Sequence, residues 1–430
     1  MKISNSIFFN WRLHALALVL ACIAEWIGIA KFDIGIGTMI LLPLLYAFVF
    51  SVFFNPNINS TLGQLVGKNG NLVAGQWILI CLMPFIAKFA VGIGPKINEI
   101  IAAGPALILQ EIGNVATVLF AMPIAVLVFG MGRESIGATH SIAREPNIAL
   151  IADRFGLKTP EGIGVMGVYV MGTLFGAIYF SIMAGVVASW NLFDVRALAM
   201  ACGVGSGSMM GACSAALSEI LPEHKEDIVA FAASSNLLTY ATGLFVSIFI
   251  ALPFAEWLFN VSSKLRKTQS ASFATEEIGT ADNDEVSISL AQLITGLVFI
   301  CTLLLIVNWV GTKTSPIEAL PGMAILFVCC LIGIFVKKIV PIGVPNIAWI
   351  SIAAIFIALP FMPMADYVIA ETDKLGLLPL ITPALAYAGM AISKSEISLF
   401  KQSGIKIIMI ALLTFTGTYL GSVVIADALL

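Results

Sequence analysis

The chain has 430 residues, of which 59% are hydrophobic and only 11% are charged, and its mean hydropathy is +1.01. Soluble domains carry about 25% charged residues, so this composition excludes a soluble globular protein and predicts an integral membrane protein. The formal net charge is −3 and no long basic tract is present, which gives no reason to expect nucleic acid as a partner. The expected partner surface is the lipid bilayer.

Apolar segments of about 20 residues, the length that crosses a bilayer as a helix, recur along the whole chain. Thirteen such segments lie near residues 11–30, 35–54, 72–94, 106–130, 133–157, 163–188, 197–219, 228–258, 287–309, 317–336, 342–361, 376–394 and 405–427. We therefore expect an all-α membrane protein with about 12–13 transmembrane helices. The fifth and seventh segments are too polar or too rich in glycine for ordinary spans, which predicts one or two discontinuous helices.

Lysine and arginine residues near the segment ends set the expected orientation, because cytoplasmic loops carry more of them. Lys2 and Arg12 precede the apolar part of the first segment, so the N-terminus is expected to be cytoplasmic. With thirteen crossings, the basic clusters at 264–267 and 337–338 fall on the same side. The expected location is the cytoplasmic (inner) membrane, with multiple passes.

Polar side chains interrupt the fourth segment, 106–130. Gln110, Asn114 and Thr117 are spaced i, i+4 and i+7, so they share one helical face. Glu111, a carboxyl group within an apolar helix, is a candidate carrier of a proton or cation. The alternative is a structural glutamate that lies near the aqueous end of the helix or pairs with a neighbouring span.

A charged stretch, residues 132–147, follows this segment. Charges at membrane depth usually face a cavity or pair with one another, so an arginine here could bind an anionic substrate. Pro146 disfavours helical geometry at Glu145, which favours a break. The alternative is a cytoplasmic loop whose basic residues only set the topology. The candidate substrate-binding residues are Arg133, Thr139, His140, Ser141, Arg144 and Asn147.

The seventh segment contains the run Gly203–Ser214, in which four glycines and three serines stand where a span normally has large apolar residues. Glycine weakens a helix and serine offers competing hydrogen bonds, so a broken helix is predicted. Transporters use such breaks to hold a substrate or an ion. The alternative is an unbroken helix that packs through its small residues. The candidate substrate ligands are Gly205, Ser206, Gly207 and Ser208.

The eighth segment, 228–258, begins with a polar run that includes Ser235, Asn236 and Thr239. Side-chain oxygens and unwound carbonyls form Na⁺ sites at discontinuous helices. These three residues, with Glu111 and Asn114, are therefore the candidates for ion coupling. The alternative is that they only hydrogen-bond neighbouring helices.

Residues 259–286 are the one extended polar insert, basic at 264–267 and then rich in Ser, Thr and acidic residues. Such a composition buries too little apolar surface to order itself, so it predicts a flexible linker. The linker would join an N-terminal membrane half, 1–258, to a C-terminal half, 287–430.

Cysteine, histidine and enzyme motifs give no sign of a cofactor. The seven cysteines lie mostly inside apolar runs without a CxxC or Cys/His cluster, so we expect buried hydrophobic residues and neither disulfides nor metal ligands. HExxH, P-loop and GxSxG motifs are missing from the sequence, so no catalytic residues are assigned. Transport would then depend on a gradient of a coupling ion such as Na⁺ or H⁺, or on the gradient of the substrate.

Two regions of the sequence share a pattern. Leu82–Gly130 and Leu378–Asp427 each contain a proline-bearing span, a turn with Lys and Glu, then Gly104 or Gly404 and another span. On the expected topology the first turn faces outward and the second inward, which is what inverted repeats would give.

Several stretches together resemble a bacterial membrane-protein family known only as a domain of unknown function. They are Gln110–Asn114, Gly132–Gly137, Arg144–Asn147, Pro160–Met166, Gly203–Ser214 and Pro316–Gly322. More remotely, the layout is similar to the glutamate–sodium symporter and bile-acid/arsenite/riboflavin transporter group. That resemblance implies a scaffold domain, a core domain with two broken helices that moves as an elevator, and a homodimer. The stretches 133–147 and 203–214 would match the broken helices. However, the GGxGT run of glutamate symporters has no copy here, and both candidate breaks lie in the first half of the chain.

The sequence thus predicts an ion-coupled secondary transporter of a small anionic metabolite, an amino acid or carboxylate. It is not expected to be an enzyme. One alternative is a membrane enzyme that uses Glu/His chemistry around Glu134, His140 and Glu145. Another is a regulatory membrane component that does not transport and acts through the 259–286 linker.

Overall fold

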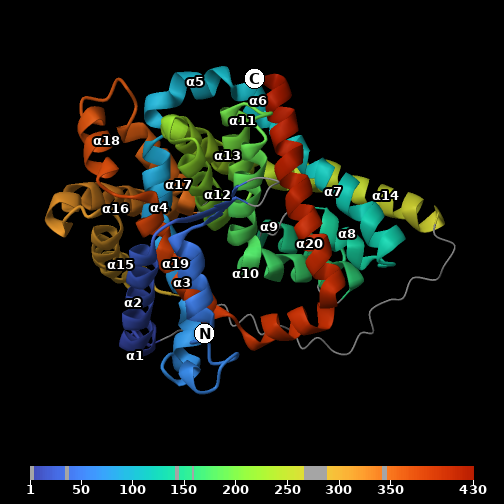
Figure 1. Cartoon of the computed structure of the whole chain (residues 1–430), viewed down its shortest axis with the longest axis horizontal. Helices are drawn as coiled ribbons and strands as arrows, with labels where there is room; N and C mark the ends of the chain where they lie inside the picture. Colours follow the sequence, from blue (N-terminus) through green and yellow to red (C-terminus); the bar gives the residue numbers. More distant parts are fainter. Residues whose placement is uncertain (1–3, 34–37, 141–144, 157–158, 266–287, 341–345) are drawn as a thin grey trace. The chain divides into compact units, whose positions relative to one another are not determined.

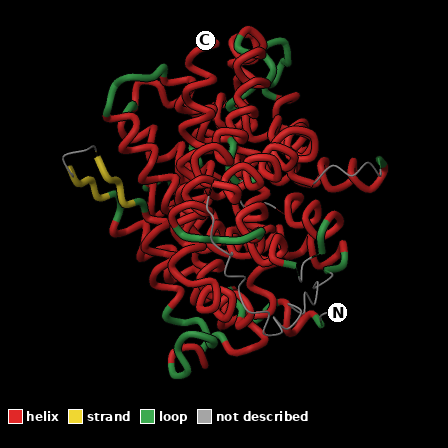
Figure 2. Tube along the Cα trace, turned by 90° about the vertical axis from the view of Figure 1, so that its right-hand side faces the viewer, coloured by secondary structure: helices red, strands yellow, loops and turns green. Residues whose placement is uncertain are grey.

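The structure, a computed structural model, describes residues 4–33, 38–140, 145–156, 159–265, 288–340 and 346–430. Helices make up nearly all of this part of the chain, as Figure 2 shows. The one sheet among the described residues is an antiparallel hairpin of β1 (Ala30–Asp33) and β2 (Thr38–Leu41), in which Ala30 lies opposite Leu41. The all-α class expected from the composition is confirmed.

The chain forms two compact units that alternate along the sequence. Unit 1 comprises residues 1–101, 221–233 and 283–394, and unit 2 comprises 102–220, 234–282 and 395–430. These units differ from the expected halves 1–258 and 287–430, because each unit takes segments from both. The pattern of apolar segments could not show this, since it does not tell which segments pack together.

Unit 1 holds the helices in blue and orange in Figure 1 and the start of α13. Its elements are α1 (Asn5–Phe8), α2 (Trp11–Ile27), the hairpin, α3 (Pro43–Val52), η1 (Leu62–Gln64), α4 (Gly67–Val91), η2 (Gly94–Lys96), α5 (Ile97–Ala102), η5 (Pro222–His224), α15 (Leu290–Thr312), α16 (Pro316–Ile339), α17 (Asn346–Ile357), α18 (Ala365–Asp373) and α19 (Leu377–Ala391). The buried helix α4 packs against α15, α17 and α19. Its Trp77 is fully buried, stacks on Phe8 and contacts the ring of His14, which fixes α1 and α2 to this core.

Three asparagines of unit 1 hold the C-terminal end of α19. The Nδ2 group of Asn55 donates to the carbonyls of Gly389, Met390 and Ile392 at 3.0, 3.1 and 2.9 Å. Asn57 donates to Ile392, and Asn71 donates to Met390 and Ile392. The last carbonyls of a helix have no partner within it, so this asparagine cluster satisfies groups that would otherwise be buried without hydrogen bonds.

Unit 2 is built around the long helix α10 (Pro160–Ser189), which packs against α8 and α12. Its other elements are α6 (Gly104–Leu109), η3 (Gln110–Ile112), α7 (Gly113–Pro123), η4 (Ile124–Val128), α8 (Glu134–Thr139), α9 (Glu145–Arg154), α11 (Val195–Gly203), α12 (Gly207–Ile220), most of α13 (Lys225–Val246), η6 (Ser247–Ala251), α14 (Leu252–Leu265) and most of α20 (Lys394–Leu429). The crossing of α8 and α10 is very close, because a Cβ atom at Gly137 would overlap the carbonyl oxygen of Glu161. Only glycine fits there.

Six helices among the described residues are long and apolar enough to span a membrane, or eight if each of two bent helix pairs is one span. Two shorter apolar helices, α3 and α17, add to these. The protein is therefore a multi-pass membrane protein. Fewer helices are long enough to span a membrane than the thirteen expected segments, because several of these segments are divided into shorter helices. Segment 133–157 contains the short helices α8 and α9, and segment 197–219 contains α11 and α12.

The expected linker 259–286 is corrected at its start. Residues 259–265 continue α14, and Phe259 is buried in a cluster with Val118, Met122 and Leu252 of unit 2. The apolar Phe259 and Leu258 extend the amphipathic helix past the point where the charged composition begins. Residues 266–287, the rest of the expected linker, lie outside the described part of the chain.

The two regions that share a sequence pattern also share a layout. The first runs from α4 through α5 and Gly104 to α7, and the second runs from α19 through the start of α20 and Gly404 to its end. Each begins in unit 1 and ends in unit 2, with the boundary near residue 101 or 394. Gly404 has a φ of 62°, which bends α20 at the position that corresponds to the start of α6. The order of elements is compatible with an internal repeat, and both the repeat and its inversion stay predictions.

Candidate functional site

The interruption predicted in the Gly203–Ser214 run is confirmed. Helix α11 ends at Gly203, helix α12 begins at Gly207, and residues 204–206 between them are not helical. A Cβ atom at Gly205 would lie 2.7 Å from the Cβ of Met209, so the backbone folds back on the next turn where only glycine fits. The break exposes the carbonyl end of one helix and the amide end of another.

Asn236 of α13 holds the carbonyl end of this break. Its Nδ2 group donates to the carbonyls of Gly203 and Gly205 at 2.8 and 2.9 Å, and the side chain is 3% exposed. The Gly203 carbonyl at the end of α11 and the Gly205 carbonyl in the break are thereby satisfied inside the unit. The interruption is therefore a built feature of the fold. The Asn236 amide makes the interhelical hydrogen bonds of the structural alternative, and its role in ion coupling stays a prediction.

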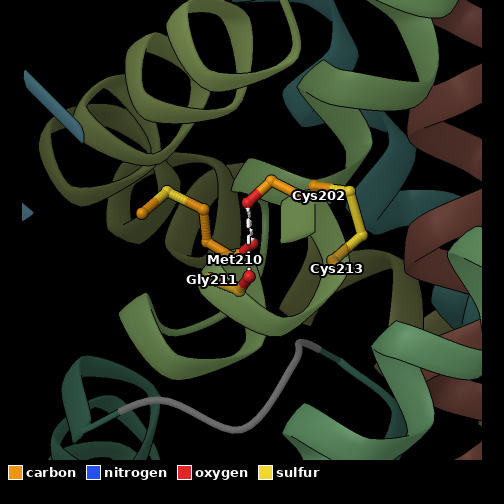
Figure 3. The surroundings of a disulfide bond; sticks show 5 residues. Cys202, Met210, Gly211 and Cys213 are labelled. Carbon is orange, nitrogen blue, oxygen red and sulfur yellow. Dashed lines mark hydrogen bonds between the residues drawn. A yellow bond between two sulfur atoms is a disulfide. The ribbon is translucent and has the colours of Figure 1, made fainter. Parts of the chain in front are cut away.

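A disulfide joins the two helices across the break, shown in Figure 3. It links Cys202 in the last turn of α11 to Cys213 in α12, whose Cα atoms are 5.4 Å apart. The expectation that all cysteines are free is wrong for this pair. The spacing along the chain showed two cysteines in one apolar segment, but the break folds that segment back so that the two residues meet. The other five cysteines are free.

The amide end of the break carries two serines. Ser206 Oγ and Ser208 Oγ lie 3.1 Å apart, and Ser206 Oγ accepts from the backbone N–H of Met209 at 3.4 Å. Both serines are only partly buried, whereas Gly205 and Gly207 between and beside them are buried. The first turn of α12 thus presents hydroxyl groups at the positive end of a helix dipole.

The second interruption, in the helix that contains Glu111, is a local change of the hydrogen-bond pattern within one continuous span, Gly104–Val128. The 3₁₀ turn η3 separates α6 from α7, and its Gln110 and Glu111 are buried. Gln110 Nε2 donates to Ser235 Oγ at 2.5 Å, and the Thr239 hydroxyl donates to the Glu111 carboxylate. On the other side, Ser422 of α20 donates to the Gln110 carbonyl at 3.3 Å. The predicted candidates Glu111, Ser235 and Thr239 are therefore brought together.

One helix, α13, joins the two interruptions, because Ser235 and Thr239 reach η3 and Asn236 reaches the 204–206 break. Two buried oxygens here, Gln110 Oε1 and Ser234 Oγ, have no hydrogen-bond partner among the described residues. Buried polar atoms are normally satisfied, so unpaired oxygens indicate a place for water, a cation or a ligand. No group of three His, Cys, Asp or Glu residues in the described ranges could hold a metal ion.

The charged stretch before α10 is arranged differently from the prediction that Arg133 is free to bind substrate. Arg133 forms an ion pair with Glu161 at the start of α10, and its guanidinium lies over the rings of Phe155 and Phe259. Glu161 is 28 positions away, and sequence reasoning missed it as the partner. The sequence signal that could have pointed to this partner was an acidic residue, Glu161, just after the proline that starts a long apolar helix.

Thr139 and His140 end α8, outside the helices that meet the criterion for a span, and both are fully buried. Burial lowers the pKa of His140 to about 4, so the imidazole is neutral at pH 7. Its Nδ1 lies 3.0 Å from the Gly137 carbonyl, while His140 Nε2 and Thr139 Oγ1 have no partner in the described ranges. No described hydrogen bond or ion pair joins α8 to the 204–206 break.

Asn147 is buried in α9. Ser141 and Arg144 lie outside the described residues, as does the side chain of Asn114 in α7.

The fold and site define a helical membrane protein in which one broken helix, α11–α12, and one span with a 3₁₀ turn, η3, both contact α13. Within that class, the sequence profile of a family described as "Protein of unknown function (DUF3100)" matches residues 22–261. The match covers more than half of the chain and includes both interruptions, so the chain belongs to this family. No curated protein and no solved structure matches the chain.

Proposed function

We propose that the protein is an ion-coupled secondary transporter of a small anionic metabolite, such as an amino acid or carboxylate. It would act in the cytoplasmic membrane with its N-terminus on the cytoplasmic side. The observation that carries the proposal is the α11–α12 break, because irregular backbone inside a membrane protein is tolerated mainly where it lines a cavity or is buried in protein. Discontinuous helices of this kind hold substrates and coupling ions in transporters.

The amide end of the break supports an anionic substrate. The first turn of α12 offers backbone N–H groups and the partly buried hydroxyls of Ser206 and Ser208. A helix of this length has a dipole equivalent to about half a positive charge at its N-terminus, which favours a carboxylate. This end is also the more accessible one, because Asn236 occupies the carbonyl end.

The second interruption supports coupling to a cation or proton. Glu111 is 1% exposed and takes a hydrogen bond from Thr239, and the neighbouring Gln110 Oε1 is unpaired among the described residues. A carboxylate, an amide oxygen and hydroxyl oxygens are the hard ligands that Na⁺ takes, and a buried carboxyl group can also carry H⁺. Both ions fit the same groups.

In this proposal Arg133 contributes less directly to substrate binding than the sequence predicted. Its charge is already compensated by Glu161 and its guanidinium is held by two aromatic rings. Substrate charge would therefore be met first by the α12 N-terminus. A direct role for Arg144 stays a prediction.

Uptake by purified protein in liposomes tests the proposal. A screen of labelled amino acids and carboxylates, with imposed Na⁺ or H⁺ gradients, should identify a substrate whose uptake collapses when the gradient is removed. Glu111→Gln should lose gradient-driven uptake, and the exposed Glu223→Gln is the matched control. Gradient-driven uptake that is the same in both variants would refute the role of Glu111.

The same purified protein can be used to distinguish a transporter from a membrane enzyme, the main alternative. Conversion of a compound into a different product by detergent-solubilised protein, without any gradient, would support a membrane enzyme. Absence of uptake for every compound that stabilises the protein against thermal unfolding would count against transport.

A further inference from the structure

A cavity in unit 1, remote in sequence from the interruptions, has the chemistry of an anion site. It has a volume of about 300 Å³ and lies where the N-terminal ends of α2 and α4 come together. Two basic residues, Arg12 and Lys68, line it together with polar and apolar residues, namely Asn10, Gln64, Leu65, Val66, Gly67 and Asn69. No acidic residue lines it.

No acidic side chain among the described residues compensates the positive charge of this cavity, although the Arg12 guanidinium lies 5.7 Å from the centroid of the Trp11 ring. Neither Arg12 nor Lys68 forms an ion pair with any described residue, and both are exposed. The first turns of α2 and α4 contain no acidic residue. A cation in the first turn of a helix is unfavourable, because the helix end already carries a partial positive charge. Two cationic side chains and two helix N-termini, which carry partial positive charge, therefore favour a bound anion here.

Asn10 adds a donor to the same cavity. Its Oδ1 accepts from the backbone N–H groups of Arg12 and Leu13, which caps α2. The oxygen is thereby used, and the Nδ2 group that remains can only donate. A cavity lined by a guanidinium, an ammonium and an amide donor matches the several oxygens of a phosphate group.

The surroundings support a position of this cavity at the level of lipid head groups. Helix α4 starts at Gly67 and is the beginning of a candidate membrane span, so the cavity lies at one end of that span. Trp11, which precedes Arg12, is 72% exposed. Leu65, which lines the cavity, is 49% exposed. Tryptophan is enriched at the membrane interface, and basic pockets at span ends bind acidic head groups.

We propose that this cavity, between Arg12 of α2 and Lys68 of α4, binds the phosphate of an anionic phospholipid. The same groups would hold free inorganic phosphate, and the test separates these two sources. The site is independent of the proposed transport function, since it lies in other elements and needs no substrate.

Native mass spectrometry of the full chain tests the site. Protein is released from nanodiscs of phosphatidylcholine with or without phosphatidylglycerol, and retained phosphatidylglycerol is counted. Removing both cations in Arg12→Gln/Lys68→Gln should weaken retention about 30-fold, since each basic residue near an anionic membrane surface contributes about 1 kcal/mol. The matched control Lys337→Gln/Lys338→Gln removes the same charge from the exposed C-terminal end of α16 and should retain the lipid.

Inorganic phosphate, compared with chloride at equal ionic strength, decides the source. If phosphate raises the thermal stability of the wild type in detergent as strongly as phosphatidylglycerol does, and the variant loses both effects, the ligand is a free phosphate. Equal retention of phosphatidylglycerol by the wild type and the Arg12/Lys68 variant would overturn the site. Equal loss in both double variants would also overturn it, because it would show only general charge attraction. If the double variant elutes as aggregate, Lys68→Gln alone is compared with Lys337→Gln by the same criteria.

Discussion

Asparagine amides cap two helix ends, that of α19 in unit 1 and that of α11 in unit 2. The two ends differ in how many asparagines cap them and in which residues follow. Three asparagines close the end of α19, and each of the three carbonyls there receives at least one side-chain amide. A single asparagine holds the end of α11, and α12 begins after three intervening residues, with the partly buried serines Ser206 and Ser208 at its start. Helix α20 likewise begins after two residues beyond α19. Both helix ends are soon followed by another helix, so they differ in the number of asparagine amides that cap the end and in the serine hydroxyls beside the next helix start. In the proposed function, the backbone amides and the serines at the start of α12 are the groups left for a ligand.

Asn55→Ala should have the largest effect on stability if this comparison is correct. It removes three amide hydrogen bonds and the acceptor for the Asn57 N–H, so the free energy of unfolding should fall by about 4 kcal/mol. Thermal unfolding in detergent measures the loss. The exposed Asn260→Ala is the control, and equal stability of the two variants would show that α19 does not depend on this clamp.

Removal of the disulfide should come next. Cys202 and Cys213 close a separation of 11 residues, and a cross-link of that length contributes about 3 kcal/mol. The Cys202→Ala/Cys213→Ala variant should therefore unfold at lower temperature than Cys329→Ala, which removes a buried free cysteine. If reducing agent and the double substitution both leave the unfolding temperature unchanged, the disulfide does not stabilise the break.

Asn236→Ala should separate stability from function. It frees two carbonyls and should cost about 2 kcal/mol, less than Asn55→Ala. Uptake per folded molecule should nevertheless fall more than tenfold, because the break loses the contact that fixes its shape, while Asn55→Ala should leave uptake per folded molecule intact. The reverse pattern would mean that unit 1 carries the site.

Ser206→Ala should have the smallest effect on stability, under about 1 kcal/mol, because one partly exposed hydroxyl is lost. Uptake of the identified substrate should fall about tenfold, the effect of one hydrogen bond to a charged group. Ser263→Ala, at the exposed end of α14, is the matched control. Unchanged uptake would remove the α12 N-terminus from the substrate site.

Much of this arrangement could be predicted from residue types and spacing. The glycines and serines of 203–214 indicate the break. The sequence singles out Glu111 as a carboxyl group in an apolar segment, but it does not predict the 3₁₀ turn η3 around it. These signals are local, since they depend on what each residue does to the helix that contains it.

The parts that sequence reasoning missed depend on contacts between distant segments. Glu161 neutralises Arg133, and Asn55 caps a helix end 334 positions away at Gly389. The Cys202–Cys213 pair is near in sequence, but its residues meet only because the break reverses the chain. Such contacts are set by how the segments pack, which a single sequence does not state.

The alternation of the two units along the chain has a consequence for how the protein is made. A chain emerges from the ribosome N-terminal end first, and contiguous domains can fold one after another. Here the hydrogen-bond partner of Thr117 in α7 is Thr418, which is synthesised 301 residues later. Gly113 likewise packs closely against Gly421 of α20, which is also made at the end of synthesis. Unit 2 is therefore incomplete until residues 395–430 have entered the membrane, and unit 1 until about residue 394. A chain severed in the 266–287 region would yield two pieces that each lack part of both units, and only their joint insertion could assemble either one.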